Sequence, residues 1–139
     1  NSKQVFDWLD QGLNEFDIII KPFDGSFENS DVIQRAREFN YSLPIVTNHC
    51  HNGTREKTNS IFRIDSSMIE MSTFKLSDLN NSFVIRLVNY SSKNESCKLI
   101  YNNFIQEIMF NPFQIKTFYI IFEKDKFSLK EVNMIENFQ

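Results

Sequence analysis

Residues 83–122 read FVIRLVNYSSKNESCKLIYNNFIQEIMFNPFQIKTFYIIF. Short apolar runs rich in Phe, Ile and Val alternate in this stretch with polar clusters such as Ser91-Ser92-Lys93-Asn94 and Asn111-Pro112. Aromatic and β-branched side chains suit the pleated, half-buried surface of a strand, whereas Asn, Ser and Pro favour turns. Many short strands separated by such turns are typical of an antiparallel sandwich or barrel.

The same pattern extends to both sides of this stretch. Apolar runs lie upstream at Ile61–Ile64 and Met68–Leu76, and the tail Glu123–Gln139 mixes charged residues with apolar ones. The tail fits either a last strand or a frayed helix. The chain has fifteen Phe and a single Ala, Ala36, which favours strands over helices. We therefore predict one all-β, mainly antiparallel β-sandwich domain over residues 1–139.

A further strand is predicted at residues 16–20, before this region. Phe16, Ile18 and Ile20 would share one face of it, because side chains alternate along a strand. Pro22 lacks the N–H that a central ladder needs, so the strand is expected to end before it.

One short helix is expected near residues 31–40. Asp31 followed three residues later by Gln34 matches the capping-box pattern at a helix start. Residues spaced by three or four positions lie on one helical face. The apolar residues on that face are Val32, Ala36 and Phe39.

Residues 47–60 contain no large apolar side chain, so we expect an exposed loop there. The cluster His49-Cys50-His51 within it is the part of the chain that looks most like a metal site. Zinc needs three or four ligands, and structural sites usually combine two separate ligand pairs. The chain has no other His, so a solvated loop is the expectation and no metal ligand is assigned.

Two predicted strands carry more apolar side chains than one buried face needs. Residues 83–88 are apolar on both faces except at Arg86, which predicts a strand covered on both sides. In residues 113–122, one face begins with Gln114 and Lys116 and then becomes apolar. Part of this strand is therefore buried against something besides the core of its own sheet, or the strand twists across the edge of its own domain.

Composition excludes several classes of protein. A net charge of −3 argues against nucleic-acid binding through a basic surface. No apolar run approaches the ~20 residues of a membrane-spanning helix, so no membrane partner is expected. Cys50 and Cys97 are expected to be free thiols, because two cysteines make no disulfide framework. No signal peptide is visible, and the compartment stays open with a cytoplasmic location favoured.

No self-sufficient active site is visible in the sequence. Acid–base hydrolysis of a glycoside needs two carboxylates that face each other across a pocket, and none of the many candidates is distinguished by its neighbours. The three glycines cannot build a phosphate-binding loop. We therefore assign no catalytic residue. The carboxylates considered are Asp7, Asp10, Glu15, Asp17, Asp24, Glu28, Asp65 and Glu70.

Two features could still concern sugars. Five sequons begin at Asn40, Asn52, Asn80, Asn89 and Asn94, although a chain rich in Asn and Ser produces several by chance. Trp8 or loop tyrosines could stack on a sugar ring, but a lone Trp beside apolar residues is more often part of a core.

Five segments, taken in order, carry a family resemblance. Asp10–Phe16 reads DQGLNEF and resembles a D-x-G-x-H-x-F stretch, and Lys21–Phe27, KPFDGSF, is similar to Y-P-H-x-G-D-W. Ala36–Pro44 then looks like a helix that runs into an A-x-x-x-N-x-P-L exit. Ile85–Asn89 resembles an L-R-L-x-N strand, and Asn111–Phe118 resembles a terminal P-F-E-I-K-T. These motifs, in this order, are those of the C-terminal β region of glycoside hydrolase family 38 α-mannosidases.

The resemblance implies a non-catalytic C-terminal domain of a larger enzyme. Family members are zinc-dependent retaining α-mannosidases whose zinc ligands and nucleophile lie in an N-terminal α/β barrel. The resemblance thus implies that this chain packs against its own catalytic domain, which would bind the zinc and the α-mannoside. The alternatives from other classes are a free-standing carbohydrate-binding β-sandwich and a sandwich that serves only as a protein-interaction domain.

The chain departs from the family motifs at several positions. Asn14 and Phe23 stand where the family has histidines, Phe27 stands for its Trp, and Gln114 stands for its Glu. If those positions help to close the sugar pocket, the resemblance implies an altered pocket here. It also leaves room for a diverged, inactive relative.

Overall fold

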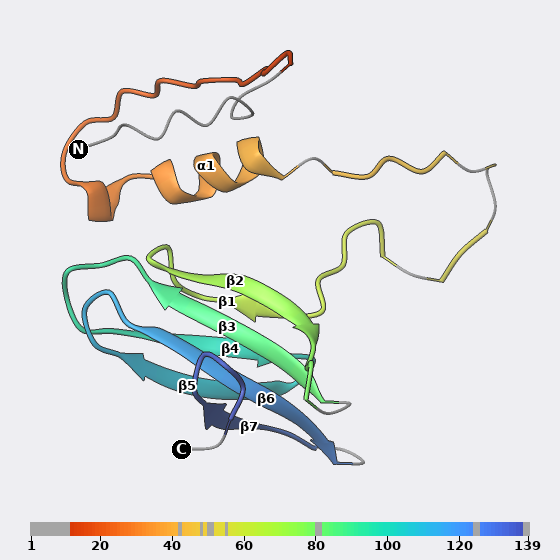
Figure 1. Ribbon diagram of the computed structural model, residues 1–139. Coiled ribbons are helices and arrows are strands. Elements are labelled where there is room, and N and C mark those ends of the chain that lie inside the picture. Colours follow the sequence, from red (N-terminus) through yellow and green to blue (C-terminus); the bar gives the residue numbers. More distant parts are fainter. Residues whose placement is uncertain are drawn as a thin grey trace, which may run out of the picture.

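The computed structural model describes residues 12–41, 43–47, 49, 52–54, 56–79, 82–123 and 126–137. In these residues, antiparallel strands form two sheets that pack face to face (Figure 1). One sheet has the order β1-β4-β5 and the other the order β2-β3-β6-β7. The predicted all-β sandwich with one short helix is confirmed. The strands are β1 (Arg63–Ile64), β2 (Ile69–Leu76), β3 (Phe83–Asn89), β4 (Glu95–Tyr101), β5 (Phe104–Phe110), β6 (Ile115–Glu123) and β7 (Lys126–Val132).

The tail forms a last strand rather than a helix. β7 pairs with β6, with Phe127 opposite Phe122 and Leu129 opposite Ile120. This register directs Phe127 into the core, where it is 8% exposed. Phe127 and Leu129 stand two residues apart and share the core face of the strand, whereas Val132 packs on the opposite face beside Val84 and Tyr119.

The core lies between the two sheets. Ile85 and Leu87 of β3 and Leu99 of β4 are fully buried there. Burying each such side chain contributes about 1.5–3 kcal/mol. Cys97 is a buried free thiol in the same cluster, and burial raises its pKa to about 11, so it stays protonated at neutral pH.

The central strand β3 is covered on its second face as well, by the chain's own C-terminal turn. Val84 is fully buried on that face beside Tyr119 and Val132. Arg86 donates through Nη2 to the carbonyl oxygen of Met134 at 2.9 Å, in the turn after β7. The two apolar faces of β3 therefore do not by themselves require a second domain.

In β6, the face that begins polar is the core face. Phe118 and Ile120 belong to the main core cluster, whereas Lys116, at the start of the strand, pairs with Glu131 at 3.2 Å. The Lys116 ammonium also lies 5.8 Å from the centre of the Phe110 ring. The switch from polar to apolar side chains thus marks where β6 enters the core of its own domain. This favours a strand that crosses the edge of its own domain over one that is buried against something else.

The strand predicted at residues 16–20 is wrong. These residues are extended and unpaired among the described residues, and Ile18 and Ile20 are 73% and 90% exposed. Such a short segment becomes a strand only beside another strand, and the described part of the chain brings none to it. Residues 27–29 form the 3-10 helix η1 (Phe27–Asn29).

The predicted helix is present as α1 (Val32–Asn40), but its capping box is not formed. The Asp31 side chain makes no cap hydrogen bond and contacts Lys21 and Arg35 instead. Gln34 donates to Glu38 at 2.9 Å rather than reaching back. Asp31 and Gln34 therefore bind nearby charged side chains instead of backbone N–H groups, since hydrogen bonds to charged groups are stronger.

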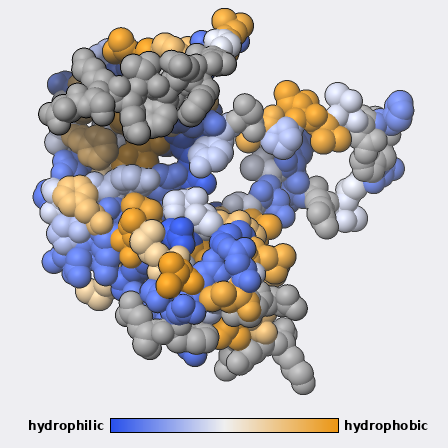
Figure 2. All heavy atoms as spheres, in the orientation of Figure 1, coloured by the Kyte–Doolittle hydropathy of each residue, from blue (hydrophilic) through white to orange (hydrophobic). Residues whose placement is uncertain are grey.

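The described residues of 43–60 form an arm that extends away from the sandwich (Figure 1). All described residues of 47–60 are exposed and lie outside helices and strands. Apolar side chains nevertheless gather at the base of the arm and along the upper edge of the molecule (Figure 2). Among the described residues, no helix is long and apolar enough to span a membrane.

Candidate functional site

Among the described residues, the side chains that could bind a metal do not come together. His49 is exposed on the arm, while Cys50 and His51 lie outside the described residues. Within the described ranges, no group of three His, Cys, Asp or Glu side chains is placed to hold an ion. Trp8, Asp7 and Asp10 also fall outside the described part of the chain.

The other candidate carboxylates are either exposed or engaged in structural contacts. Asp65 accepts a hydrogen bond from the backbone N–H of Lys98 at 2.6 Å, which joins the loop after β1 to β4. Glu15, Asp17 and Asp24 lie on the exposed segment before η1. The Asp65 contact is therefore structural, and nothing among the described residues sets the exposed carboxylates of Glu15, Asp17 and Asp24 apart for chemistry on a substrate.

Glu28 and Glu70 line one groove of about 640 Å³ between η1, α1 and β2. Glu70 forms an ion pair with Arg37 at 2.6 Å, and Glu28 accepts from the Ser92 hydroxyl at 3.0 Å. Its own backbone N–H first, and then Ser92, lower the pKa of Glu28. A general acid needs a raised pKa, so Glu28 is poorly suited to donate a proton to a leaving group.

The groove is better suited to binding than to catalysis. Tyr41 and Tyr90 lie near it: the Arg37 guanidinium is 5.8 Å from the centre of the Tyr41 ring. Burial, and then the neighbouring Glu70 carboxylate, raise the pKa of Tyr90, which therefore stays a neutral phenol and can donate a hydrogen bond. Charged, hydroxyl and aromatic groups are thus collected at one opening.

The two motifs in the sandwich that carry the family resemblance lie in contact with each other. Arg86 of β3 donates through Nε to the Thr117 hydroxyl of β6 at 3.1 Å. The backbone N–H of Asn89 donates to the Gln114 carbonyl at 2.9 Å, and the Gln114 side chain accepts from the Asn111 N–H at 2.8 Å. The polar residues of these motifs therefore bind one another.

Asn89 fixes this contact from a buried position. Its amide donates to the carbonyl oxygens of Lys93 and Asn111, at 3.0 and 2.9 Å, and accepts from the Ser91 N–H at 2.9 Å. The side chain is only 1% exposed. The sequon that begins at Asn89 therefore has no room for a glycan in the folded state, and the residue joins the β3–β4 loop to the β5–β6 turn.

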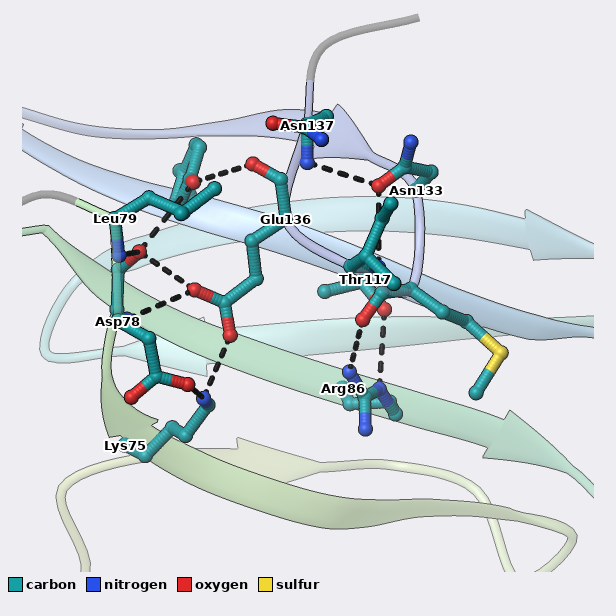
Figure 3. A network of polar contacts seen from close by, with 12 residues as sticks. Lys75, Asp78, Leu79, Arg86, Thr117, Asn133, Glu136 and Asn137 are labelled. Carbon is teal, nitrogen blue, oxygen red and sulfur yellow. Dashed lines mark hydrogen bonds and ion pairs between the residues drawn. The ribbon is translucent and has the colours of Figure 1, made fainter.

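A second polar network, which the sequence did not reveal, fixes the C-terminal turn (Figure 3). Glu136 is 5% exposed and accepts from the Ser77 hydroxyl at 2.6 Å and from the Asp78 N–H at 3.1 Å. Its carboxylate also pairs with Lys75 at 2.7 Å, and its carbonyl accepts from the Tyr119 hydroxyl at 2.5 Å. These contacts cover the outer face of the β2-β3-β6-β7 sheet.

The turn itself had a weak sequence signal. The Asn133 side chain accepts from the N–H groups of Ile135 and Asn137, at 3.1 and 2.8 Å, as Asn often does in turns. Glu136 adopts a φ of 65°, in the left-handed region. An Asn directly after Val132 is a weak signal for a turn. Nothing in the sequence identifies the residues that the turn contacts.

The feature that stands apart is a surface of exposed apolar side chains in residues 12–41. Neither η1 nor α1 contains a buried residue. The extended residues 17–22 run beside α1 (Figure 1), and between them lies a groove of about 970 Å³. We call this the N-terminal apolar surface. Its members are Leu13, Phe16, Ile18, Ile19, Ile20, Phe23 and Phe39, all between 42% and 90% exposed.

Large exposed apolar surfaces mark sites of interaction in soluble proteins. The candidate site best supported by the geometry is therefore a docking surface. Comparisons with protein-family models, with curated proteins and with solved structures found no match.

Proposed function

We propose that this chain is the non-catalytic C-terminal β-sandwich of a family 38 α-mannosidase-like glycoside hydrolase and packs against the catalytic domain of that enzyme. The observation that carries the proposal is the N-terminal apolar surface. Its Ile18 and Ile20 are 73% and 90% exposed, whereas Ile85 and Leu87 of the sandwich are fully buried. Apolar side chains of this size stabilise a protein only when another surface removes them from water.

The polar contacts of the sandwich support a scaffold role. Arg86 and Asn89 belong to motifs of the family resemblance, and their side chains bind Thr117, Lys93 and Asn111 of the same chain. Residues engaged in this way hold loops in place rather than act on a substrate. Hydrolysis of the α-mannoside, and the zinc that supports it, are assigned to the catalytic domain.

The proposal is tested by comparing two purified proteins on an aryl α-mannoside. The 139-residue chain should show no turnover, with or without added zinc. The polypeptide encoded by the complete gene should hydrolyse the substrate, and a chelator should abolish this activity. Turnover by the 139 residues alone would overturn the proposal, and so would a complete gene product that lacks α-mannosidase activity.

A second candidate, a free-standing carbohydrate-binding sandwich, is favoured by the groove between η1, α1 and β2. Its Arg37 and Glu70 can hydrogen-bond hydroxyl groups, and aromatic rings lie nearby. Calorimetry with mannose oligosaccharides would test it on the wild-type chain and on the variants Trp8→Ala and Arg37→Ala. Saturable binding that either variant abolishes would favour the binding module, and no detectable heat would exclude it.

A further inference from the structure

The C-terminal turn, residues 133–137, is held on the outer face of the β2-β3-β6-β7 sheet by polar contacts rather than by apolar side chains of its own. Its Met134 and Ile135 are 57% and 72% exposed, whereas its Glu136 is 5% exposed. The turn therefore depends on one nearly buried carboxylate. The residues clustered beneath it are Val84, Tyr119 and Val132, all less than 5% exposed.

The contacts of this carboxylate reach β2 and the loop after it (Figure 3). The Lys75 ammonium lies 2.7 Å from one oxygen of Glu136, and the Ser77 hydroxyl and the Asp78 N–H donate to the other at 2.6 and 3.1 Å. The Tyr119 hydroxyl of β6 donates to the Glu136 carbonyl at 2.5 Å. A single residue of the turn thus connects it to two strands of the sheet.

The backbone of the turn opposes this arrangement. Glu136 has a φ of 65°, in the left-handed region that residues with a Cβ atom adopt at a cost. Such a conformation persists only when the surrounding contacts compensate for it. Weakening the contacts of the carboxylate therefore favours release of the turn.

The groups around Glu136 are arranged for a negative charge. Its partners on Lys75, Ser77 and Asp78 all donate to it, so a proton on the carboxyl would replace an ion pair and compete with these donors. Asp78, and then Glu136, raise the pKa of Lys75, which therefore stays charged in acid.

Charged groups from the other strands of the sheet act in the same direction. Arg86 of β3 donates to the Met134 carbonyl at 2.9 Å, and Lys130 of β7 stands opposite Tyr119 on the same face. The Asp78 carboxylate, which also faces the turn, pairs with Lys75. The positive charges favour the ionised form of Glu136.

We propose that the C-terminal turn is an acid-sensitive switch: protonation of Glu136 detaches residues 133–137 and uncovers Val84 and Tyr119, while the core between the two sheets stays folded. No residue of the turn belongs to the main core cluster. Lys75, and then Ser77, lower the pKa of Glu136, so the turn is closed at neutral pH and opens below pH 4.5. This inference goes beyond the proposed function and does not depend on it.

An NMR titration of the 139-residue chain from pH 7 to pH 3 tests the switch. The amide signals of Asp78 and residues 133–137 should shift with one midpoint below pH 4.5, and the heteronuclear NOE of the turn should fall to that of a mobile segment. The amides of Ile85 and Leu99, in the core, should keep their folded shifts. Loss of turn and core signals together would overturn the proposal, and so would a turn that stays rigid at pH 3.

The variant Glu136→Gln imitates the protonated carboxyl at neutral pH. At pH 7, the amides of Asp78 and Asn137 should exchange with solvent at least 10-fold faster in this variant than in the wild type. Glu131→Gln is the matched control, because the Glu131 carboxylate is 51% exposed and pairs with Lys116 instead. It should change the exchange of these amides by less than 2-fold. Exchange at the wild-type rate in Glu136→Gln would overturn the proposal.

Discussion

The sandwich and the segment that precedes it contain the same kinds of apolar side chain with opposite degrees of burial. Ile85 and Leu87 of β3 are 0% exposed, whereas Ile18 and Ile20 are 73% and 90% exposed. Both pairs stand two residues apart in apolar runs that predict a strand. The difference shows that alternation sets the tendency to form a strand, while burial depends on whether a second surface is present.

The most direct test of this difference in burial is to shorten one side chain in the sandwich and one in the preceding segment of the isolated chain. Leu87→Ala should lower the free energy of unfolding by about 2–5 kcal/mol, because it leaves a cavity in a close-packed core. Ile18→Ala, the control, should change it by less than about 0.5 kcal/mol, as at other exposed positions. Urea denaturation followed by circular dichroism measures both values. Equal losses would show that the exposed segment also belongs to the folded core.

The sequence predicted most of the sandwich because each strand carries its own signal. The runs around Ile85, Leu99 and Phe118 are short and rich in β-branched and aromatic residues, and Asn- or Ser-rich turns separate them. The same reasoning failed at Phe16–Ile20, where three consecutive Ile give an equally clear signal. A strand there depends on a partner edge, and no local pattern shows whether the described chain supplies one.

The contacts of the candidate sites were harder to predict than the strands. Asp31 and Gln34 have the spacing of a capping box, but Lys21, Arg35 and Glu38 bind their side chains instead. Glu136 lies 58 or more positions from the groups that it binds near Lys75. Competition between polar partners and contacts over such separations depend on the finished fold, which one sequence does not display.

Within the sandwich, Asn89→Ala should cause the next largest loss in the free energy of unfolding. It removes the amide that binds the carbonyl oxygens of Lys93 and Asn111, and it leaves these groups and the Ser91 N–H without their partner. Leaving buried polar groups unpaired costs about 1–3 kcal/mol in unfolding free energy. Asn94→Ala, in the exposed part of the same loop, is the matched control. If both variants unfold at the same urea concentration, the buried amide does not fix the loops.

The C-terminal turn should make the sandwich sensitive to acid. Lys75, and then Ser77, lower the pKa of Glu136 below its ordinary value of 4.5. A carboxyl group with a lowered pKa in the folded state stabilises the fold above its unfolded value, and the contribution is lost as the pH falls through the folded value. Thermal unfolding from pH 7 to pH 3 should therefore show a fall in midpoint below about pH 4.5.

The variant Glu136→Gln isolates this contribution. Its amide cannot ionise, so the variant should be less stable than the wild type at pH 7 and should approach it as the pH falls. Other carboxyl groups with lowered pKa values, such as those of Glu28, Asp31 and Glu38, are present in both proteins and cancel in the difference. A constant difference between the two proteins from pH 7 to pH 3 would contradict the assignment to Glu136.

The smallest expected change in unfolding free energy concerns the ion pair that links α1 to the sandwich. Arg37 of α1 reaches Glu70 of β2 at 2.6 Å, and both side chains are partly exposed. Ion pairs at a protein surface contribute about 0–1 kcal/mol, so Arg37→Ala should change the unfolding free energy of the isolated chain by less than ~1 kcal/mol. It should nevertheless shift the amide NMR signals of Glu70 and Tyr90, because α1 leaves their surroundings.

Arg35→Ala provides the control for this link. Arg35 pairs with Asp31 and Glu38, which belong to the helical region itself, so its loss should leave the signals of Glu70 and Tyr90 in place. A loss of more than ~2 kcal/mol in Arg37→Ala would exceed what a surface ion pair supplies and would mean that helix and sandwich unfold as one unit. The small loss expected instead means that the sandwich is stable by itself. The helix and residues 16–20 would then owe their final position to the surface that covers them.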